Sequence, residues 1–350
     1  MKRQRWIGTG VAVLLLAGAL VGCGGTGAEG EAGDTSGAAG SNLPASPTSP
    51  TSDPPDAESQ AGAAAYTPVT LDNYGREVTV TARPTQVLTL GPNATELFVA
   101  LGLTDYVIGN SLDNHSRGAL PEYEEAYARI PELTYGSATR EAVVTSGADF
   151  IYGIDWEFGS EGLNVEELER LGMSVYMNSA ATLEQMYGEI RDLGRIFAIE
   201  AEAEAFIADQ DARLAAVQER VASSDPVDVL VYDSGGEGVF TAGGTNFESL
   251  LIGYAGGRNV FDDITDKQWT TVSYEEVLKR DPDVIVIHDY DAPSLAQKIA
   301  DIKSHPALSE LEAVRNERFV AISLESVLPG GRMAYAVETL AAGFHPDVSP

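Results

Sequence analysis

Short apolar runs alternate with capped, amphipathic segments along the chain from residue 66 onward. In the first half of this region, buried strands are predicted for the apolar runs 86–90, 106–108, 149–152 and 174–177. Helices are predicted between them, over 93–102, 139–146 and 165–171. Strand–helix alternation of this kind favours a mostly parallel sheet with helices on both faces.

The second half of the chain repeats this alternation. Strands are predicted for 227–232, 283–287 and 319–322, and the last helix is predicted for 332–342. One helix start in each half carries a capping-box pattern, in which two side chains three positions apart satisfy free backbone N–H groups. The two predicted boxes are Asn93 with Glu96 and Thr245 with Glu248.

A helical connection is predicted between the two halves. Thr182 and Gln185 form a capping box, and apolar side chains recur on one helical face from Leu183 to Phe197. A second helical stretch, 200–222, spans about 34 Å at 1.5 Å per residue, which is long enough to cross from one lobe to the other.

The length of the chain after residue 65 also favours two lobes. About 285 residues are too many for one comfortable core and suit two of ordinary size. The predicted fold is α/β, with two Rossmann-like lobes joined by a single long backbone helix. The lobes are expected over 66–181 and 223–350, with the connecting helices over 182–222.

Residues 1–22 are predicted to be a secretory signal peptide. A basic tip precedes an apolar stretch, Val11 to Val21, that is too short to span a membrane stably. The ending Leu20-Val21-Gly22-Cys23 resembles the lipobox of bacterial lipoproteins, which implies that Cys23 carries the lipid. The alternative is an ordinary signal peptide with an incidental cysteine.

Residues 23–65 are predicted to be the lipidated cysteine followed by a disordered tether. The stretch is rich in Gly, Ala, Ser, Thr and Pro and holds almost no large apolar side chain, so it cannot offset its ordering entropy. Cys23 is the only cysteine, which leaves the exported domain without disulfides. No later stretch approaches the roughly twenty apolar residues of a membrane helix. We therefore expect an extracytoplasmic protein on the outer face of the cytoplasmic membrane, anchored by lipid alone.

The chain is strongly acidic, with 53 acidic against 22 basic side chains and a formal net charge of −31. Such a charge argues against binding to nucleic acid and against lying on anionic lipid. A plain solvated surface, a salty habitat and a cationic ligand are each compatible with it. The expected protein is a monomer without an intrinsic cofactor.

A local sequence pattern that occurs once in each half supports the duplication of the lobe. Thr139 and Ser273 each precede a short helix, and in both cases an acid follows two positions on and an Asp-led strand comes next. The two acids are Glu141 and Glu275. Taken alone, either glutamate is also explained by the preference of helix starts for negative charge.

Four segments together resemble the substrate-binding proteins of ABC importers for iron–siderophore complexes, haem and cobalamin. These segments are 87–97, 148–151, 256–261 and 272–278 with its following strand. The resemblance implies two α/β lobes, binding without catalysis, and a permease dimer as partner. It also implies that Glu141 and Glu275, one on each lobe, dock into the two permease subunits.

The resemblance places the ligand between the lobes, beyond the carboxyl ends of the strands. A metal chelate is expected there, and a neutral or cationic ferric siderophore of the hydroxamate type is favoured because basic side chains are scarce in the cleft loops. Cobalamin, haem or a deazaflavin precursor are the organic alternatives. For Trp156, Trp269 and Tyr135, ligand contact competes with core packing. The candidate ligand residues are Tyr135, Trp156, Asp233, Trp269 and Arg332.

Two other classes of function compete with this interpretation. A receptor for bare zinc or manganese would need three or four converging His, Asp or Glu side chains, to which His115 and His288 could contribute across the cleft. Surface or capping roles suit both histidines as well. An enzyme is disfavoured, because the chain lacks a Gly-x-Ser-x-Gly elbow, a His-Glu-x-x-His helix and a complete phosphate-binding loop.

Overall fold

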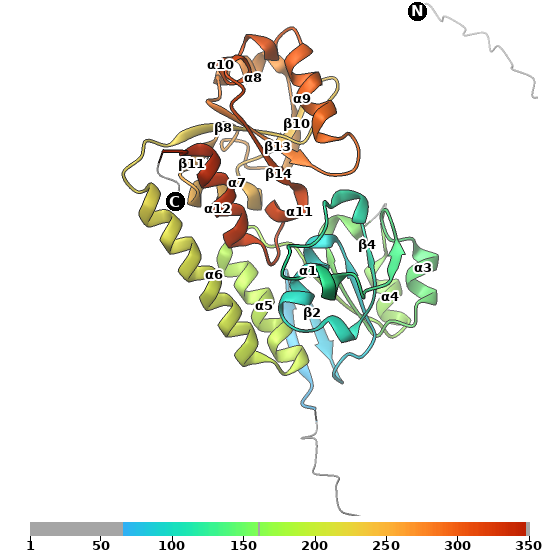
Figure 1. Ribbon diagram of the computed structural model, residues 1–350. Coiled ribbons are helices and arrows are strands. Elements are labelled where there is room, and N and C mark those ends of the chain that lie inside the picture. The colour runs from blue at the N-terminus through green and yellow to red at the C-terminus, as the bar shows by residue number, and fades with distance from the viewer. Residues whose placement is uncertain (1–65, 160–161, 348–350) are drawn as a thin grey trace, which may run out of the picture. The chain divides into compact units, whose positions relative to one another are not determined.

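Two parallel β-sheets, one from each half of the chain, form the framework of the protein (Figure 1). The computed structural model describes residues 66–159 and 162–347. The strands of the first sheet are β3 (Val87–Leu90), β4 (Val107–Ser111), β5 (Glu132–Thr134), β6 (Phe150–Ile154) and β7 (Ser174–Asn178). Those of the second are β8 (Val227–Tyr232), β11 (Gly257–Asn259), β13 (Val284–Asp289) and β14 (Phe319–Ser323).

Each sheet contains a topological switch point, where successive strands stop being added on one side of the first strand and are added on the other. The strand orders are β5-β4-β3-β6-β7 and β11-β8-β13-β14, with all neighbouring strands parallel. The switch point falls between β3 and β6 in the first sheet and between β8 and β13 in the second. At such points the loops leave in opposite directions and open a crevice at the carboxyl ends of the strands. The predicted α/β class is confirmed.

Of the twelve helices in the described residues, eight lie close to predicted positions, whereas those over Glu124–Tyr127, Leu295–Ser304, Glu312–Arg315 and Leu324–Val327 were not predicted. In chain order the twelve are α1 (Pro92–Ala100), α2 (Glu124–Tyr127), α3 (Arg140–Thr145), α4 (Val165–Arg170), α5 (Leu183–Phe197), α6 (Glu200–Val221), α7 (Phe247–Tyr254), α8 (Tyr274–Arg280), α9 (Leu295–Ser304), α10 (Glu312–Arg315), α11 (Leu324–Val327) and α12 (Met333–Phe344). Thr182 caps α5 as predicted, since its hydroxyl accepts from the backbone N–H of Gln185 at 3.2 Å.

The other two predicted capping boxes are wrong. Helix α1 begins after Gly91, whose φ of 120° suits glycine, and Pro92 occupies its first turn. The Asn93 side chain instead donates to the carbonyl of Pro329 at 2.6 Å. Helix α7 is capped by Asn246 rather than Thr245, with the side-chain oxygen accepting from the Glu248 N–H at 2.9 Å. The side chains of Glu96 and Glu248 therefore do not cap a helix; they pair with Arg332 and His288 in the interior.

Two smaller antiparallel sheets were not anticipated from the sequence. A hairpin pairs β1 (Val69–Asn73) with β2 (Arg76–Val80). A three-stranded sheet has the order β12-β10-β9, formed by Trp269–Val272, Val239–Ala242 and Ser234–Gly235. Its three strands are short and come after β8 in the chain. They bring the side chains of Phe240 and Trp269 to the carboxyl end of β8.

A continuous apolar core joins the two halves. One cluster of buried side chains contains Phe98 of α1 and Phe197 of α5 from the first half, with Val231 of β8 and Val337 of α12 from the second. Helix α6 packs against both α5 and α12, and Figure 1 shows α5 and α6 side by side. The long helix is thus held by helices of both halves of the chain. Such packing resists wide opening of the cleft.

The turn between α5 and α6 forces an alanine into the left-handed region. Ala198 ends α5 with φ 54° and ψ 53°, a conformation that disfavours residues with a Cβ. Its side chain is exposed, so no packing is lost when it is removed. We expect Ala198→Gly to raise the free energy of unfolding by about 0.5–1 kcal/mol in urea denaturation.

A matched control is Ala222→Gly at the end of α6, where φ is −57° and the side chain is also exposed. Glycine relieves nothing there and is expected to lower stability by up to about 1 kcal/mol. Equal losses in both variants would contradict the backbone argument.

Candidate functional site

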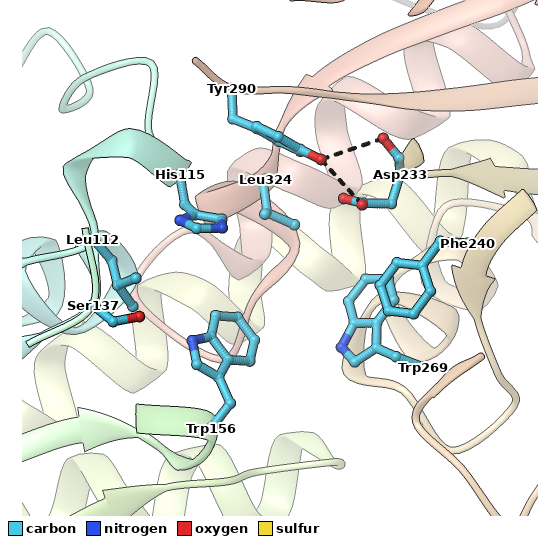
Figure 2. Close-up of a pocket in the computed structure, with 9 residues that line it drawn as sticks. All are labelled: Leu112, His115, Ser137, Trp156, Asp233, Phe240, Trp269, Tyr290 and Leu324. Atoms are coloured by element: carbon cyan, nitrogen blue, oxygen red, sulfur yellow. Dashed lines mark hydrogen bonds between the residues drawn. The ribbon is translucent and has the colours of Figure 1, made fainter. Parts of the chain in front are cut away.

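A cavity of about 400 Å³ lies beyond the carboxyl ends of the strands of both parallel sheets (Figure 2). Its lining comprises Leu112, His115, Ser137, Trp156, Asp233, Phe240, Trp269, Tyr290 and Leu324. A volume in this range is typical of small-ligand sites.

Strand ends position most of these side chains. Leu112 follows β4 directly, and Trp156 lies in the short turn after β6. Asp233 follows β8, and Leu324 opens α11 directly after β14. Tyr290 comes one residue after β13. The cavity therefore lies at the topological switch points of both sheets, where the predicted crevice should be.

Aromatic side chains form facing parts of the cavity wall. Trp269 and Phe240, from the neighbouring strands β12 and β10, stack with ring centroids 5.7 Å apart and planes at 19°. Trp156 approaches from the first sheet with 41% of its surface exposed, and its indole projects into the space opposite Trp269 in Figure 2. Large exposed aromatic faces of this kind favour stacking against a flat or apolar ligand surface.

A chain of buried polar groups lies behind one wall. The Asp233 carboxylate is 3.0 Å from Nδ1 of His288. It also accepts a hydrogen bond from the Tyr290 hydroxyl at 3.1 Å, which is drawn in Figure 2. On the far side of the ring, Nε2 of His288 is 3.0 Å from the carboxylate of Glu248. Both Glu248 and His288 have no exposed surface, whereas Asp233 lines the cavity. Each buried charge here has a hydrogen-bonded partner.

These contacts alter the pKa values of His288 and Asp233. Burial disfavours the His288 imidazolium, but the negative charge of Glu248 and the hydrogen bonds that the ring donates to both carboxylates outweigh it and raise the pKa of His288 to about 9. Burial also works against the ionised form of Asp233, yet the hydrogen bond and charge of His288 hold the pKa of that carboxyl below its usual range. At neutral pH, the carboxylate is ionised and faces the cavity.

Lys298 completes this cluster from helix α9. Its ammonium donates to the backbone carbonyl of His288 at 2.8 Å and lies 3.4 Å from the centre of the Tyr290 ring. Burial lowers the pKa of Lys298 to about 8. The side chain is 1% exposed, so it supports the cavity wall from behind.

His115 presents a different kind of nitrogen to the cavity. Its Nδ1 is 2.9 Å from Oδ1 of Asn114, which can only accept, so the proton is assigned to Nδ1. Burial lowers the pKa of His115, which keeps the ring neutral at pH 7. His115 therefore adds polarity without charge.

One edge of the cavity is closed by contacts between the two halves. The backbone N–H of Asp291 donates to the carbonyl of Asn114 at 3.2 Å, and Arg117 pairs with Asp289 at 3.4 Å. The loop that carries His115 is therefore tied to the loop that carries Tyr290.

Three of the five candidate ligand residues line the cavity, namely Trp156, Asp233 and Trp269. Tyr135 does not. It is 51% exposed, and its carbonyl accepts from the N–H of Asn114 at 3.0 Å, which places it behind the His115 loop. Leu112, Ser137, Phe240, Leu324 and Tyr290 also line the cavity, and none of them was among the candidate ligand residues. Apart from Ser137 and Phe240, these follow strand ends, so that signal was available.

Arg332 lies away from the cavity lining, contrary to its predicted contact with ligand. Its guanidinium binds the carboxylate of Glu96 through two nitrogens, one of them at 2.7 Å, and pairs with Glu325 at 3.2 Å. The guanidinium also donates a hydrogen bond to the carbonyl of Gly118 at 2.7 Å. With its donors already engaged and only 5% of its surface exposed, Arg332 joins the two halves of the chain.

The two predicted docking glutamates occupy equivalent local structures. Glu141 is exposed in the first turn of α3, behind Thr139, whose hydroxyl accepts from Ala142 N at 3.2 Å. Glu275 is exposed in the first turn of α8, behind Ser273, which accepts from Glu276 N at the same distance. Over the described ranges, neither carboxylate takes part in an ion pair.

Two features of the described residues bear on the possibilities of a bare-metal site and of a membrane-spanning helix. In residues 66–159 and 162–347, no three His, Cys, Asp or Glu side chains are grouped so that they could hold a metal ion. Within the same ranges, no helix has the length and apolar character needed to cross a membrane. Residues 1–65, including Cys23 and the predicted signal peptide and tether, lie outside the described part of the chain.

Two parallel sheets with a ligand-sized cavity at their carboxyl ends define a two-lobed solute-binding protein. The chain belongs to the periplasmic binding protein family, whose family model matches residues 87–324. This confirms the resemblance to the substrate-binding proteins of ABC importers, a family of extracytoplasmic transport proteins.

Individual relatives agree with this assignment. An uncharacterised ABC transporter substrate-binding lipoprotein of Bacillus subtilis is 23% identical over 286 residues, covering 80% of this chain and 86% of its own. A vitamin B12-binding protein of Photorhabdus laumondii is 27% identical over 207 residues, covering 59% and 71%. The solved structure of an ABC-type Fe³⁺-hydroxamate transport system from Saccharomonospora viridis matches with a TM-score of 0.67 at 25% identity, over 79% of this chain and 99% of its own.

The His288 cluster predicts a pH dependence of stability. Because the pKa of His288 rises from 6.5 to about 9 on folding, the folded state holds a proton that the unfolded state releases above pH 6.5. Stability is therefore full below pH 6.5 and falls as pH rises toward 9. We expect a loss of roughly 1–2 kcal/mol between pH 6.5 and 8 in urea denaturation.

This window avoids the opposing effect of Lys298, whose lowered pKa makes stability rise only between about 8 and 10.5. The control is His288→Gln, which has no proton to release and should show a flat profile from pH 6.5 to 8. A flat or rising profile in the unaltered protein would contradict the assignment.

Proposed function

We propose that the protein captures a metal chelate, most simply a neutral or cationic ferric siderophore of the hydroxamate type, and delivers it to an ABC permease. The observation that carries this proposal is the cavity itself. It combines aromatic walls from both halves of the chain with a single carboxylate, and no Lys or Arg side chain is among the described residues that line it.

The composition of the lining supports a chelate of low negative charge. Trp156, Trp269 and Phe240 offer apolar faces to the hydrocarbon shell of such a ligand. A strongly anionic catecholate complex would bring negative charge next to Asp233 without a compensating cation. The relative from Saccharomonospora viridis, named for Fe³⁺-hydroxamate transport, supports the same ligand class.

A flat organic cofactor is the second candidate. The two indoles face the same space from the two halves of the chain, which would suit a planar ring system such as cobalamin, haem or a deazaflavin precursor. The vitamin B12-binding relative favours cobalamin among these. A bare metal ion would be held by few groups here, since only His115 and Asp233 in the lining are metal-ligand types.

The rest of the proposal concerns delivery. Cys23 would anchor a monomeric receptor to the outer face of the cytoplasmic membrane after removal of residues 1–22, and the stretch 24–65 would act as the tether. Glu141 and Glu275 would each dock into one permease subunit. Their support is that both are exposed, stand at equivalent helix starts and lie on different parallel-sheet lobes. Binding requires no bond to form or break, so no ligand turnover is expected.

Ligand capture can be tested by tryptophan fluorescence. The chain from residue 24 onward lacks Trp6 and retains Trp156 and Trp269, which both line the cavity. A ferric trihydroxamate should quench their emission saturably at one equivalent, with a Kd of about 1 μM or tighter. Trp156→Leu and Trp269→Leu should each weaken binding.

The comparators in this titration are haem, cobalamin, free Fe³⁺ and free Zn²⁺. A response to haem or cobalamin alone would select the organic cofactor, and a response to a free ion alone would select the metal receptor. Conversion of any bound ligand into a product would overturn the assignment as a binding protein.

Docking can be tested separately from binding. Glu141→Ala with Glu275→Ala should abolish uptake of radiolabelled ferric chelate by cells while ligand affinity stays unchanged. The matched control is Glu166→Ala with Glu312→Ala, since these are exposed first-turn glutamates of α4 and α10 in the same two halves. Unchanged uptake in the first pair, or equal loss in both pairs, would refute the docking roles.

A further inference from the structure

We propose that Asp233 makes the cleft selective for the positive charge of its ligand, and that Glu248, His288 and Lys298 fix this carboxylate in place from behind. The inference rests on the proposed capture of a chelate in this cavity. It adds a charge class to the ligand and assigns positioning roles to three residues that the ligand does not reach.

Asp233 is the one ionised side chain among the residues that line the cavity. His115, another titratable side chain of the lining, is neutral at pH 7 because burial opposes its protonated form and lowers its pKa. The remaining lining side chains are apolar, aromatic or hydroxyl-bearing. A ligand in this space therefore meets one full charge, and that charge is negative.

The buried cluster holds the carboxylate in a fixed orientation. His288 approaches one oxygen of Asp233 at 3.0 Å, and the Tyr290 hydroxyl donates to the other oxygen at 3.1 Å. His288 is itself held between two acids, since Glu248 is 3.0 Å from its second nitrogen. Each oxygen of Asp233 retains further acceptor capacity, and the side chain is 12% exposed. A carboxylate ordered in advance loses little freedom when a cation binds.

The cluster is balanced in charge, which explains how it can stay ionised in the interior. Asp233 and Glu248 carry two negative charges, and His288 and Lys298 carry two positive ones at pH 7. The two cations are 0% and 1% exposed, so neither can contact a ligand. Of these four charged side chains, Asp233 is the one that lines the cavity, and it is negatively charged. Replacing Asp233 by a neutral residue would leave an excess positive charge behind the wall and remove the preference for a cationic ligand.

Three chelates with the same ferric trihydroxamate core provide the test. Ferrioxamine B carries a terminal ammonium, its N-acetyl derivative is neutral, and its N-succinyl derivative is anionic. Each is titrated against the chain from residue 24 onward, which contains all the residues that the structure describes. Binding is followed by tryptophan fluorescence at 50 mM salt. We expect the cationic chelate to bind on the order of tenfold more tightly than the neutral one, and the anionic chelate to bind most weakly.

Three variants locate the source of this preference. Asp233→Asn should abolish the advantage of the cationic chelate and improve binding of the anionic one. Asp233→Glu keeps the charge and should keep the order of affinities. Asp225→Asn changes the net charge equally but lies at the amino end of β8, away from the cavity, and should leave the order unchanged.

The outcomes separate this inference from the proposed function. Equal affinity of the unaltered protein for all three chelates overturns the charge selectivity and leaves chelate capture standing; this comparison needs no variant to fold. Persistence of the preference in Asp233→Asn, or its loss in Asp225→Asn, overturns the role of Asp233. If none of the three chelates binds, the proposed function fails and the inference fails with it.

Discussion

The buried guanidinium of Arg332 holds the two halves of the chain together, and the shape of the cavity depends on that junction. It binds Glu96 on α1 through two nitrogens and Glu325 on α11 through a third. Removing one partner from such a buried pair costs about 3–5 kcal/mol, because the other charge is left without compensation. An apolar cluster that includes Phe98 and Val337 also spans the two halves. Together they hold the carboxyl ends of two separate sheets at the same cavity.

This constraint explains why a cavity built from loops can be well defined. Trp156 and Asp233 each follow a strand within two residues, so their backbone is fixed by the sheets. At the cavity edge, the contacts of Asn114 and Arg117 with the second half limit relative movement of the lobes. A preorganised site of this kind binds without a large ordering cost, which suits a receptor that must capture a dilute solute.

The periodic pattern of the sequence was sufficient to predict seven of the nine strands of the parallel sheets and most of the longer helices, because apolar runs and caps are local signals. The three-residue strands β5 and β11 and helix α9 were not predicted. The strand-end rule then located Trp156 and Asp233. Arg332 was misjudged because its partner Glu96 is 236 positions away and was assigned to a cap. Phe240 was missed because its place in the cavity depends on an antiparallel sheet of strands two to four residues long. The contact of His288 with Glu248 likewise joins residues 40 positions apart, which no local pattern records.

The most direct test of the account is the position of the metal in a crystal of the chain from residue 24 onward with a ferric trihydroxamate. Anomalous scattering at the iron edge locates the ion without reference to the fold. The account predicts one strong peak inside the cavity, between the indoles of Trp156 and Trp269, with the ligand in contact with Asp233. A peak on another surface of the protein, with the cavity empty, would contradict it.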